Sequence, residues 1–330
     1  MGVGEFLGKL FAAPSGNGGE LVLRAYGKLP FYAEYRRLEL APGLPTVFSQ
    51  WMDAGRLAWA KAPSRQASGV TRTARLMLAL PEAREFVLAS VWDSRDSLGR
   101  AFPFSFFITC PVEALGADPL ARFVAAGALQ KAFSSFHAEL SSLGRGGDFY
   151  KHYQRRILTV KPDGAAPAQA REQAVKLDAA GWMAALGLTP AAAEAWRASL
   201  ARKRARWISQ PETFAETAIS LPLAPGLSLE AQAAVWLMWL ESPLMKLSHP
   251  FSLVLPDESR PPLRLHLLAR KLLPDDFQLV TTDDASYGYV ENLTPQPGAG
   301  ASGDPVPTAP APAVTATPSG SLLDWLLRPV

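Results

Sequence analysis

The sequence VWDSRDSLGRAFPFSFFI, residues 91–108, joins two apolar runs through a short polar turn. Gly99 permits the positive backbone φ angle that such a reversal often needs. Asp96 and Arg100 are four residues apart, so a curled turn would bring them within reach of a charge-assisted hydrogen bond, and we expect the Ser94 hydroxyl to cap the turn. A catalytic role for Asp96 would need a nucleophile beside it, and the sequence offers none. The stretch therefore predicts two adjacent strands and a structural or partner-binding role for the turn.

Alternating apolar residues elsewhere extend this strand pair into a sheet. Strands are expected over residues 21–26, 74–80, 86–92, 102–109 and 157–160. Phe102, Phe104, Phe106 and Ile108 should share one face of the fourth strand, because successive side chains alternate. Helices are expected over 44–61 and from Pro119 to Gly144, with Asp118 as the N-cap of the second. The pattern predicts an α/β (α+β) fold in which a central, mainly antiparallel sheet is flanked by helices.

Composition divides the chain into five segments. They are a flexible N-terminal appendage with a short amphipathic helix (1–20), a core domain (21–165), a helical and β extension packed on it (166–293), a disordered Pro- and Ala-rich linker (294–320) and an apolar C-terminal tip (321–330). The appendage either docks on a partner or membrane surface or packs on its own domain. The tip is either a tethered docking peptide or a segment that folds back onto the protein.

Charge and cysteine content limit the classes of partner and compartment. The chain has 33 Lys and Arg against 30 Asp and Glu, so no nucleic-acid partner is expected. The basic cluster between Arg197 and Arg206 is interpreted as a charged helix end. Cys110 is the single cysteine, which excludes an internal disulfide and fits a reducing compartment. No signal peptide is recognisable, and the apolar run 231–240 is shorter than the roughly 20 residues of a membrane span. We expect a cytoplasmic protein.

Motifs for common chemistries are absent from the sequence. It contains no H-E-x-x-H, no G-x-S-x-G and no P-loop, and no two of its histidines have the four-residue spacing of a helical metal pair. Adjacent acidic pairs such as Asp275–Asp276 are more typical of turns than of a spaced acid and base. We therefore expect a protein that is not an enzyme and needs neither cofactor nor metal.

Two motifs resemble those of the TagF family, which is associated with bacterial type VI secretion. The first lies in YGKLPFYAEYRR, residues 26–37, and the second reads S-x-D-x-x-G-R-x-F-P over 94–103. The matching residues are Gly27, Lys28, Leu29, Pro30, Arg37, Trp51, Ser94, Asp96, Gly99, Arg100, Phe102 and Pro103, and Glu34 stands within Ala33–Tyr35 where members usually have G-D-F. The resemblance covers about residues 22–140. Ser252–Leu255 lies where members often carry a Ser-x-Trp-Trp strand, but it lacks the tryptophans.

The resemblance implies a function as well as a fold. TagF proteins have a central sheet flanked by helices and are cytoplasmic accessory proteins that repress assembly or firing of the secretion system after translation. They are linked to a forkhead-associated scaffold protein. The expected partners are therefore type VI secretion components. Contact with a membrane is expected to be at most peripheral, through the N-terminal segment. The motif residues are expected to form the binding surface. The alternative is a longin-like or roadblock-like adaptor that regulates a small GTPase at a membrane.

Overall fold

The computed structural model describes residues 20–61, 73–79, 84–144, 147–159, 164–256, 263–280, 290–295 and 320–328. The strands are β1 (Glu20–Val22), β2 (Arg24–Gly27), β3 (Arg36–Leu38), β4 (Ala74–Ala79), β5 (Glu85–Trp92), β6 (Phe104–Pro111), β7 (Ile157–Thr159), β8 (Ala218–Leu223), β9 (Ser252–Pro256), β10 (Leu263–Leu268) and β11 (Glu291–Asn292). The α-helices are α2 (Leu44–Lys61), α3 (Pro119–Leu143), α4 (Phe149–Tyr153), α5 (Ala166–Val175), α6 (Ala179–Ala185), α7 (Pro190–Ser209), α8 (Pro211–Ala215), α9 (Leu229–Trp239), α10 (Glu241–Leu244) and α11 (Leu322–Leu327). Two 3₁₀ segments, η1 (Val112–Leu115) and η2 (Pro274–Val280), complete the described structure.

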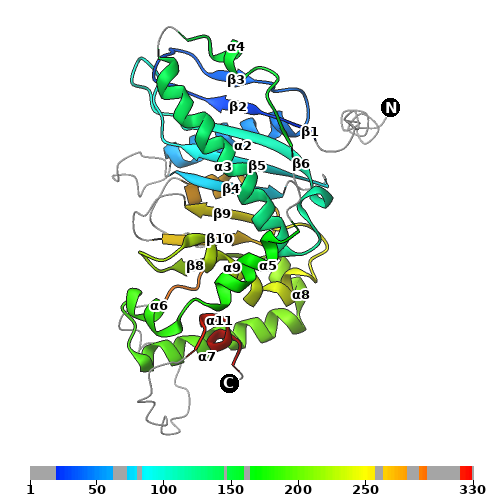
Figure 1. Cartoon of the computed structure of the whole chain (residues 1–330), viewed down its shortest axis with the longest axis vertical. Coiled ribbons are helices and arrows are strands. Elements are labelled where there is room, and N and C mark those ends of the chain that lie inside the picture. The colour runs from blue at the N-terminus through cyan, green and yellow to red at the C-terminus, as the bar shows by residue number, and fades with distance from the viewer. Residues whose placement is uncertain are drawn as a thin grey trace.

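One nine-stranded sheet organises the molecule (Figure 1). Its strand order is β11-β8-β10-β9-β4-β5-β6-β2-β3, and every neighbouring pair is antiparallel except β11 with β8. Strands β1 and β7 form a separate antiparallel pair. The prediction of a mainly antiparallel sheet flanked by helices is confirmed.

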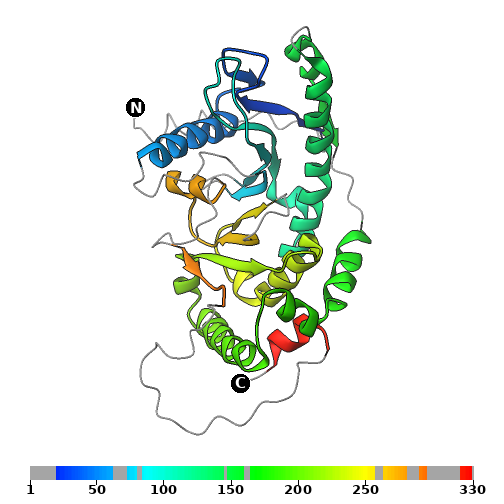
Figure 2. The same ribbon diagram turned by 90° about the vertical axis from the view of Figure 1, so that its left-hand side faces the viewer.

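Helices cover both faces of this sheet (Figure 2). The long helix α3 lies on one face, and α2 with η2 lies on the other. Each face buries its own apolar cluster: Phe104, Phe106 and Phe133 belong to the α3 side, whereas Phe48 and Phe107 belong to the α2 side. Such a sheet buries both faces, so β4 and β5 are apolar along almost their whole length instead of alternating.

Several local predictions agree with the structure, and one is wrong. Helix α2 has the predicted bounds, and Asp118 caps α3 by accepting a hydrogen bond from the Ala121 N–H at 2.8 Å. Phe102, however, packs in the cluster on the α2 side, opposite Phe104. The cause is Pro103, which follows it and lies just before β6, so the regular strand alternation begins only at Phe104.

The structure describes only some of the five segments expected from composition. The sheet is continuous between segments 21–165 and 166–293, because β9 pairs directly with β4. The appendage helix and nearly all of the linker lie outside the described residues. The C-terminal tip folds back: four apolar side chains of α11 are buried against the protein. Within the described ranges, no helix combines the length and the apolar character needed to cross a bilayer.

Candidate functional site

The first motif touches the second at the end of β2. Gly27 pairs with Phe104 of β6 and has a backbone φ of +132°. A Cβ atom here would lie only 2.1 Å from the carbonyl oxygen of Pro103. Residues other than glycine are therefore disfavoured at this position, both by the backbone conformation and by the lack of space for a Cβ atom. The glycine of the G-K-L-P sequence is what allows the two motifs to meet in backbone contact.

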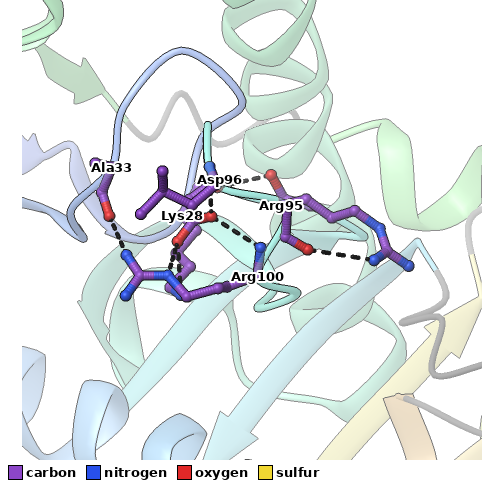
Figure 3. Close-up of polar contacts among 8 residues, drawn as sticks. Lys28, Ala33, Arg95, Asp96 and Arg100 are labelled. Atoms are coloured by element: carbon purple, nitrogen blue, oxygen red, sulfur yellow. Dashed lines mark hydrogen bonds and ion pairs between the residues drawn. The ribbon is translucent and has the colours of Figure 1, made fainter.

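The carboxylate of Asp96 joins the motifs more tightly (Figure 3). Its Oδ2 accepts hydrogen bonds from Lys28 Nζ at 2.9 Å and from Arg100 Nε at 2.7 Å. Its Oδ1 accepts from the backbone N–H groups of Leu98 at 3.0 Å and Arg100 at 2.8 Å. The bond between Asp96 and Arg100 that their spacing predicted is confirmed. The bond from Lys28 was not predicted, because the two residues are 68 positions apart.

Both charges of the central ion pair are buried, with Lys28 6% and Asp96 4% exposed. Burial by itself would raise the pKa of the Asp96 carboxyl, since a charge is costly away from water. The hydrogen bonds from Lys28 and Arg100 outweigh that effect and hold the pKa of Asp96 well below its usual range. The Asp96 carboxylate is therefore ionised at neutral pH. Removal of either partner would leave the other charge buried without its counter-charge.

Two further side-chain bonds fasten the turn to the first motif. Ser94 Oγ donates to the backbone carbonyl of Lys28 at 2.7 Å, and Arg100 Nη2 donates to the carbonyl of Ala33 at 2.5 Å. Ser94 thus does not cap its own turn as predicted. The close contact at Gly27 places a carbonyl from the other motif within reach of the hydroxyl. Gly99 has the expected positive φ of +79°.

The motif residues separate into a buried framework and an exposed rim. Gly27, Lys28, Leu29, Trp51, Asp96, Phe102 and Pro103 are buried, Ser94 is half-buried, and Pro30, Glu34, Arg37, Gly99 and Arg100 are exposed. Two exposed residues at variable positions of the second motif, Arg95 and Leu98, lie beside this rim. Leu98 is 67% exposed. We call Pro30, Glu34, Arg37, Arg95, Leu98, Gly99 and Arg100 the loop surface.

An aromatic cluster packs next to the residues of the loop surface. The rings of Tyr26 and Tyr35 stack at 5.6 Å, and Phe102 meets Tyr35 edge-on at 4.9 Å. Tyr26 donates its hydroxyl to the Asp53 carboxylate of α2, 2.7 Å from each oxygen. Burial, and secondly this hydrogen bond, raise the pKa of Tyr26 far above its ordinary value. Sequence reasoning missed Asp53, because no local pattern relates it to a tyrosine on another element.

Trp51 has a packing role between α2 and η2. Its indole Nε1 donates to the carbonyl of Leu273 at 2.9 Å, and its ring meets Phe277 edge-on at 5.4 Å. Gly55, one turn later, allows this close approach, since a Cβ there would lie 2.2 Å from the Cβ of Phe277. The tryptophan of the family pattern therefore secures the helix behind the motifs and is itself buried.

Outside the motifs, several titratable side chains pack against or bond to neighbouring residues of the protein. His137 stacks on Trp92 with ring centroids 4.1 Å apart, and burial lowers its pKa. His152 Nε2 lies 3.0 Å from a carboxylate oxygen of Glu139. Burial raises the pKa of the Cys110 thiol to about 12, which suits an inert side chain. The described part of the chain holds no group of three or more His, Cys, Asp or Glu side chains arranged to hold a metal ion.

The basic cluster on α7 is used within the protein. Arg197 is buried and lies 2.5 Å from the carboxylate of Glu194. Lys203 forms an ion pair with Glu291 of β11. Arg204 donates through Nε to the backbone carbonyl of Trp239 at 2.6 Å. Of the cluster interpreted as a charged helix end, Arg206 lies in the last turn of α7, whereas the three residues above lie earlier in the helix and are held by contacts within the protein.

Two hollows lie away from the motifs. One of about 610 Å³ is bordered by Lys246, His249 and Arg270, and one of about 210 Å³ lies between α3, α5 and α9. Neither is lined by a motif residue. The loop surface is thus separate from both hollows.

Comparisons with known proteins give little further information. No family model matches the chain, and no curated protein matches it. Among solved structures, the chain is weakly similar to PA0076 from Pseudomonas aeruginosa PAO1, known from a crystal structure. The two share 18% sequence identity over 46% of this chain and 77% of the other, with a TM-score of 0.30. A likeness at this level carries no conclusion about function.

Proposed function

We propose that the protein is a non-enzymatic, cytoplasmic accessory protein of a bacterial type VI secretion system. It represses assembly or firing by binding another protein through the loop surface. The observation that carries this proposal is the ion pair between Lys28 and Asp96, which locks two sequence motifs 68 residues apart into one unit. The same motifs carry the resemblance to TagF proteins.

The distribution of polar contacts favours binding over catalysis. The Asp96 carboxylate accepts four hydrogen bonds, and all of them come from the motif loops themselves. A general base needs a lone pair free to meet its substrate. The network instead fixes the backbone of both loops before any partner arrives, which reduces the entropy lost on association.

The loop surface combines one exposed leucine with several positive charges. Leu98 is 67% exposed, Arg95 and Arg100 are exposed in the same turn, and Arg37 is exposed on strand β3. Glu34 and Asp93 are the exposed acidic residues of the motif loops. An apolar anchor with charged neighbours is typical of a protein interface. The charge balance favours an acidic patch on the partner.

The resemblance supplies the class of partner: components of the secretion system, the forkhead-associated scaffold protein among them. The test is affinity capture from the source bacterium with three versions of the chain, namely the unchanged protein, Leu98→Asp and Leu57→Asp. Leu57 lies on α2 and is 62% exposed, so its substitution is a matched control. Each variant is also overexpressed while secretion is measured.

We expect the unchanged chain and Leu57→Asp to capture secretion components and to reduce secretion, and Leu98→Asp to do neither. Unaltered secretion on overexpression and on deletion would contradict the proposal, as would equal capture by all three proteins. Capture of a nucleotide-loaded small GTPase in place of secretion components would favour the adaptor alternative.

A further inference from the structure

The C-terminal helix α11 occupies a groove made by other helices. It lies against α5, α6, α7 and α9, at the end of the molecule opposite β3 (Figures 1 and 2). Leu322, Leu323, Trp325 and Leu326 are each at most 6% exposed, whereas Leu327 on the outer side is 44% exposed. A helix of six residues is too short to be stable alone. Its order therefore comes from the groove.

The groove is held together by contacts that do not involve α11. Trp182 and Trp196 stack at 5.7 Å, and Trp236 meets Trp196 edge-on at 6.2 Å. Their indole N–H groups donate to Gln232 Oε1 at 2.8 Å, to the Leu293 carbonyl at 2.8 Å and to the Pro222 carbonyl at 2.9 Å, respectively. The aromatic floor is thus pre-organised, as in a receptor for a short helix.

Polar groups at both ends of α11 fix its position and direction. At the start of the helix, the Leu322 N–H donates to the Leu177 carbonyl at 2.7 Å, and just before it the Ala179 N–H donates to the Gly320 carbonyl at 3.1 Å. In the middle, Trp325 Nε1 donates to Glu194 Oε2 at 3.2 Å. After the helix, the buried Arg197 donates to the Arg328 carbonyl at 2.7 Å.

Arg197 and Glu194 together contact two different parts of the C-terminal segment. The arginine that bonds Arg328 also pairs with Glu194, the carboxylate that receives the Trp325 indole. Backbone contacts at both ends with an aromatic anchor between them are typical of peptide recognition. Residues 296–319 link α11 to the rest of the chain, and a segment of that length extends to roughly 80 Å at most.

We propose that this groove is a peptide-binding site whose occupant is the chain's own segment 320–328, bound reversibly. The ligand it fits is a short amphipathic helix that starts with a serine cap and presents Leu-Leu-x-Trp-Leu on one face. When the segment leaves, the groove exposes a tryptophan-lined apolar surface. The intramolecular link keeps the groove filled at ordinary protein concentrations.

The test uses a chain that lacks residues 320–330 and a fluorescent synthetic peptide of residues 318–330. We expect saturable binding of the peptide to the shortened chain, and binding at least tenfold weaker to the full chain, where the groove is filled. In the peptide, Leu326→Ala should weaken binding roughly 30-fold or more. Leu327→Ala is the matched control, because that neighbouring leucine points outward, and its effect should stay within about threefold.

A second measurement leaves the full chain intact until it is folded. A protease site is placed between residues 300 and 315, the folded protein is cut there, and the labelled peptide is added. Exchange of the cut tail for the peptide, with the near-UV circular dichroism of the body retained, is the expected result. Unfolding of the shortened chain or of the cut body, failure of the tail to exchange, or equal losses from the two leucine substitutions would each overturn the proposal.

Discussion

Replacing Gly27 by alanine tests the contact that brings the motifs together. The backbone φ of +132° is a region that L residues rarely adopt, and holding alanine there costs about 2 kcal/mol. The new Cβ would also lie 2.1 Å from the Pro103 carbonyl oxygen, so β2 and β6 must separate locally. Losing two ladder hydrogen bonds adds about 2 kcal/mol.

The sum of about 4 kcal/mol is large for one methyl group, and in a chain of 330 residues it lowers the melting temperature by about 6 °C. Gly99→Ala is the matched control. It makes the same change in the other motif at a φ of +79°, but no atom lies within 4 Å of the new Cβ. Only the conformational cost of about 1 kcal/mol remains, which corresponds to a shift of about 1.5 °C in the melting temperature.

Urea and thermal unfolding followed by tryptophan fluorescence measure both variants against the unchanged chain. We expect Gly27→Ala to unfold far earlier than Gly99→Ala, or to fail to fold. Equal, small shifts for the two would refute the reasoning, because they would mean that the strands are not in close contact at Gly27.

Three other predictions concern single side chains. The pKa of Asp96 is lowered in the folded protein, so the contribution of this carboxylate to stability is complete above its ordinary pKa of about 4 and is lost as the pH falls below that value. Urea midpoints of the unchanged chain should therefore fall more steeply between pH 5 and 3 than those of Asp96→Asn. Parallel curves would contradict this. Burial raises the pKa of the Cys110 thiol to about 12, so a thiol reagent at pH 8 should label the protein only after unfolding, and rapid labelling of the native chain would show that the thiol is accessible. Trp51→Phe removes the hydrogen bond to Leu273 and should lower the free energy of unfolding by about 1 kcal/mol, whereas an unchanged urea midpoint would argue against that bond.

Local patterns predicted much of the fold. The period of α2, the Asp118 cap of α3 and the turn containing Asp96 and Arg100 all depend on residues a few positions apart. Such features are set by backbone preferences and short-range hydrogen bonds, which the sequence displays directly. Two local predictions were wrong. Pro103 interrupts the alternation on which the assignment of Phe102 relied, and the Ser94 hydroxyl bonds the distant Lys28 carbonyl instead of its own turn.

Long-range contacts could not be derived in the same way. The pairing of β9 with β4 joins segments that composition had separated, and the hydrogen bond between Tyr26 and Asp53 joins a strand to a helix. The Lys28 partner of Asp96 is equally remote. The resemblance identified both motifs but did not say which of their residues are buried. That division depends on the packing of the whole sheet.

The proposed function requires that the loop surface is the part of the molecule that meets a partner. Hydrogen–deuterium exchange of the chain, alone and with the protein that it captures, tests this most directly. We predict that amides of residues 28–37 and 94–101 become protected on binding and that Leu98→Asp abolishes the change. Unaltered exchange in both loops, with protection confined to other parts of the chain, would contradict the central claim.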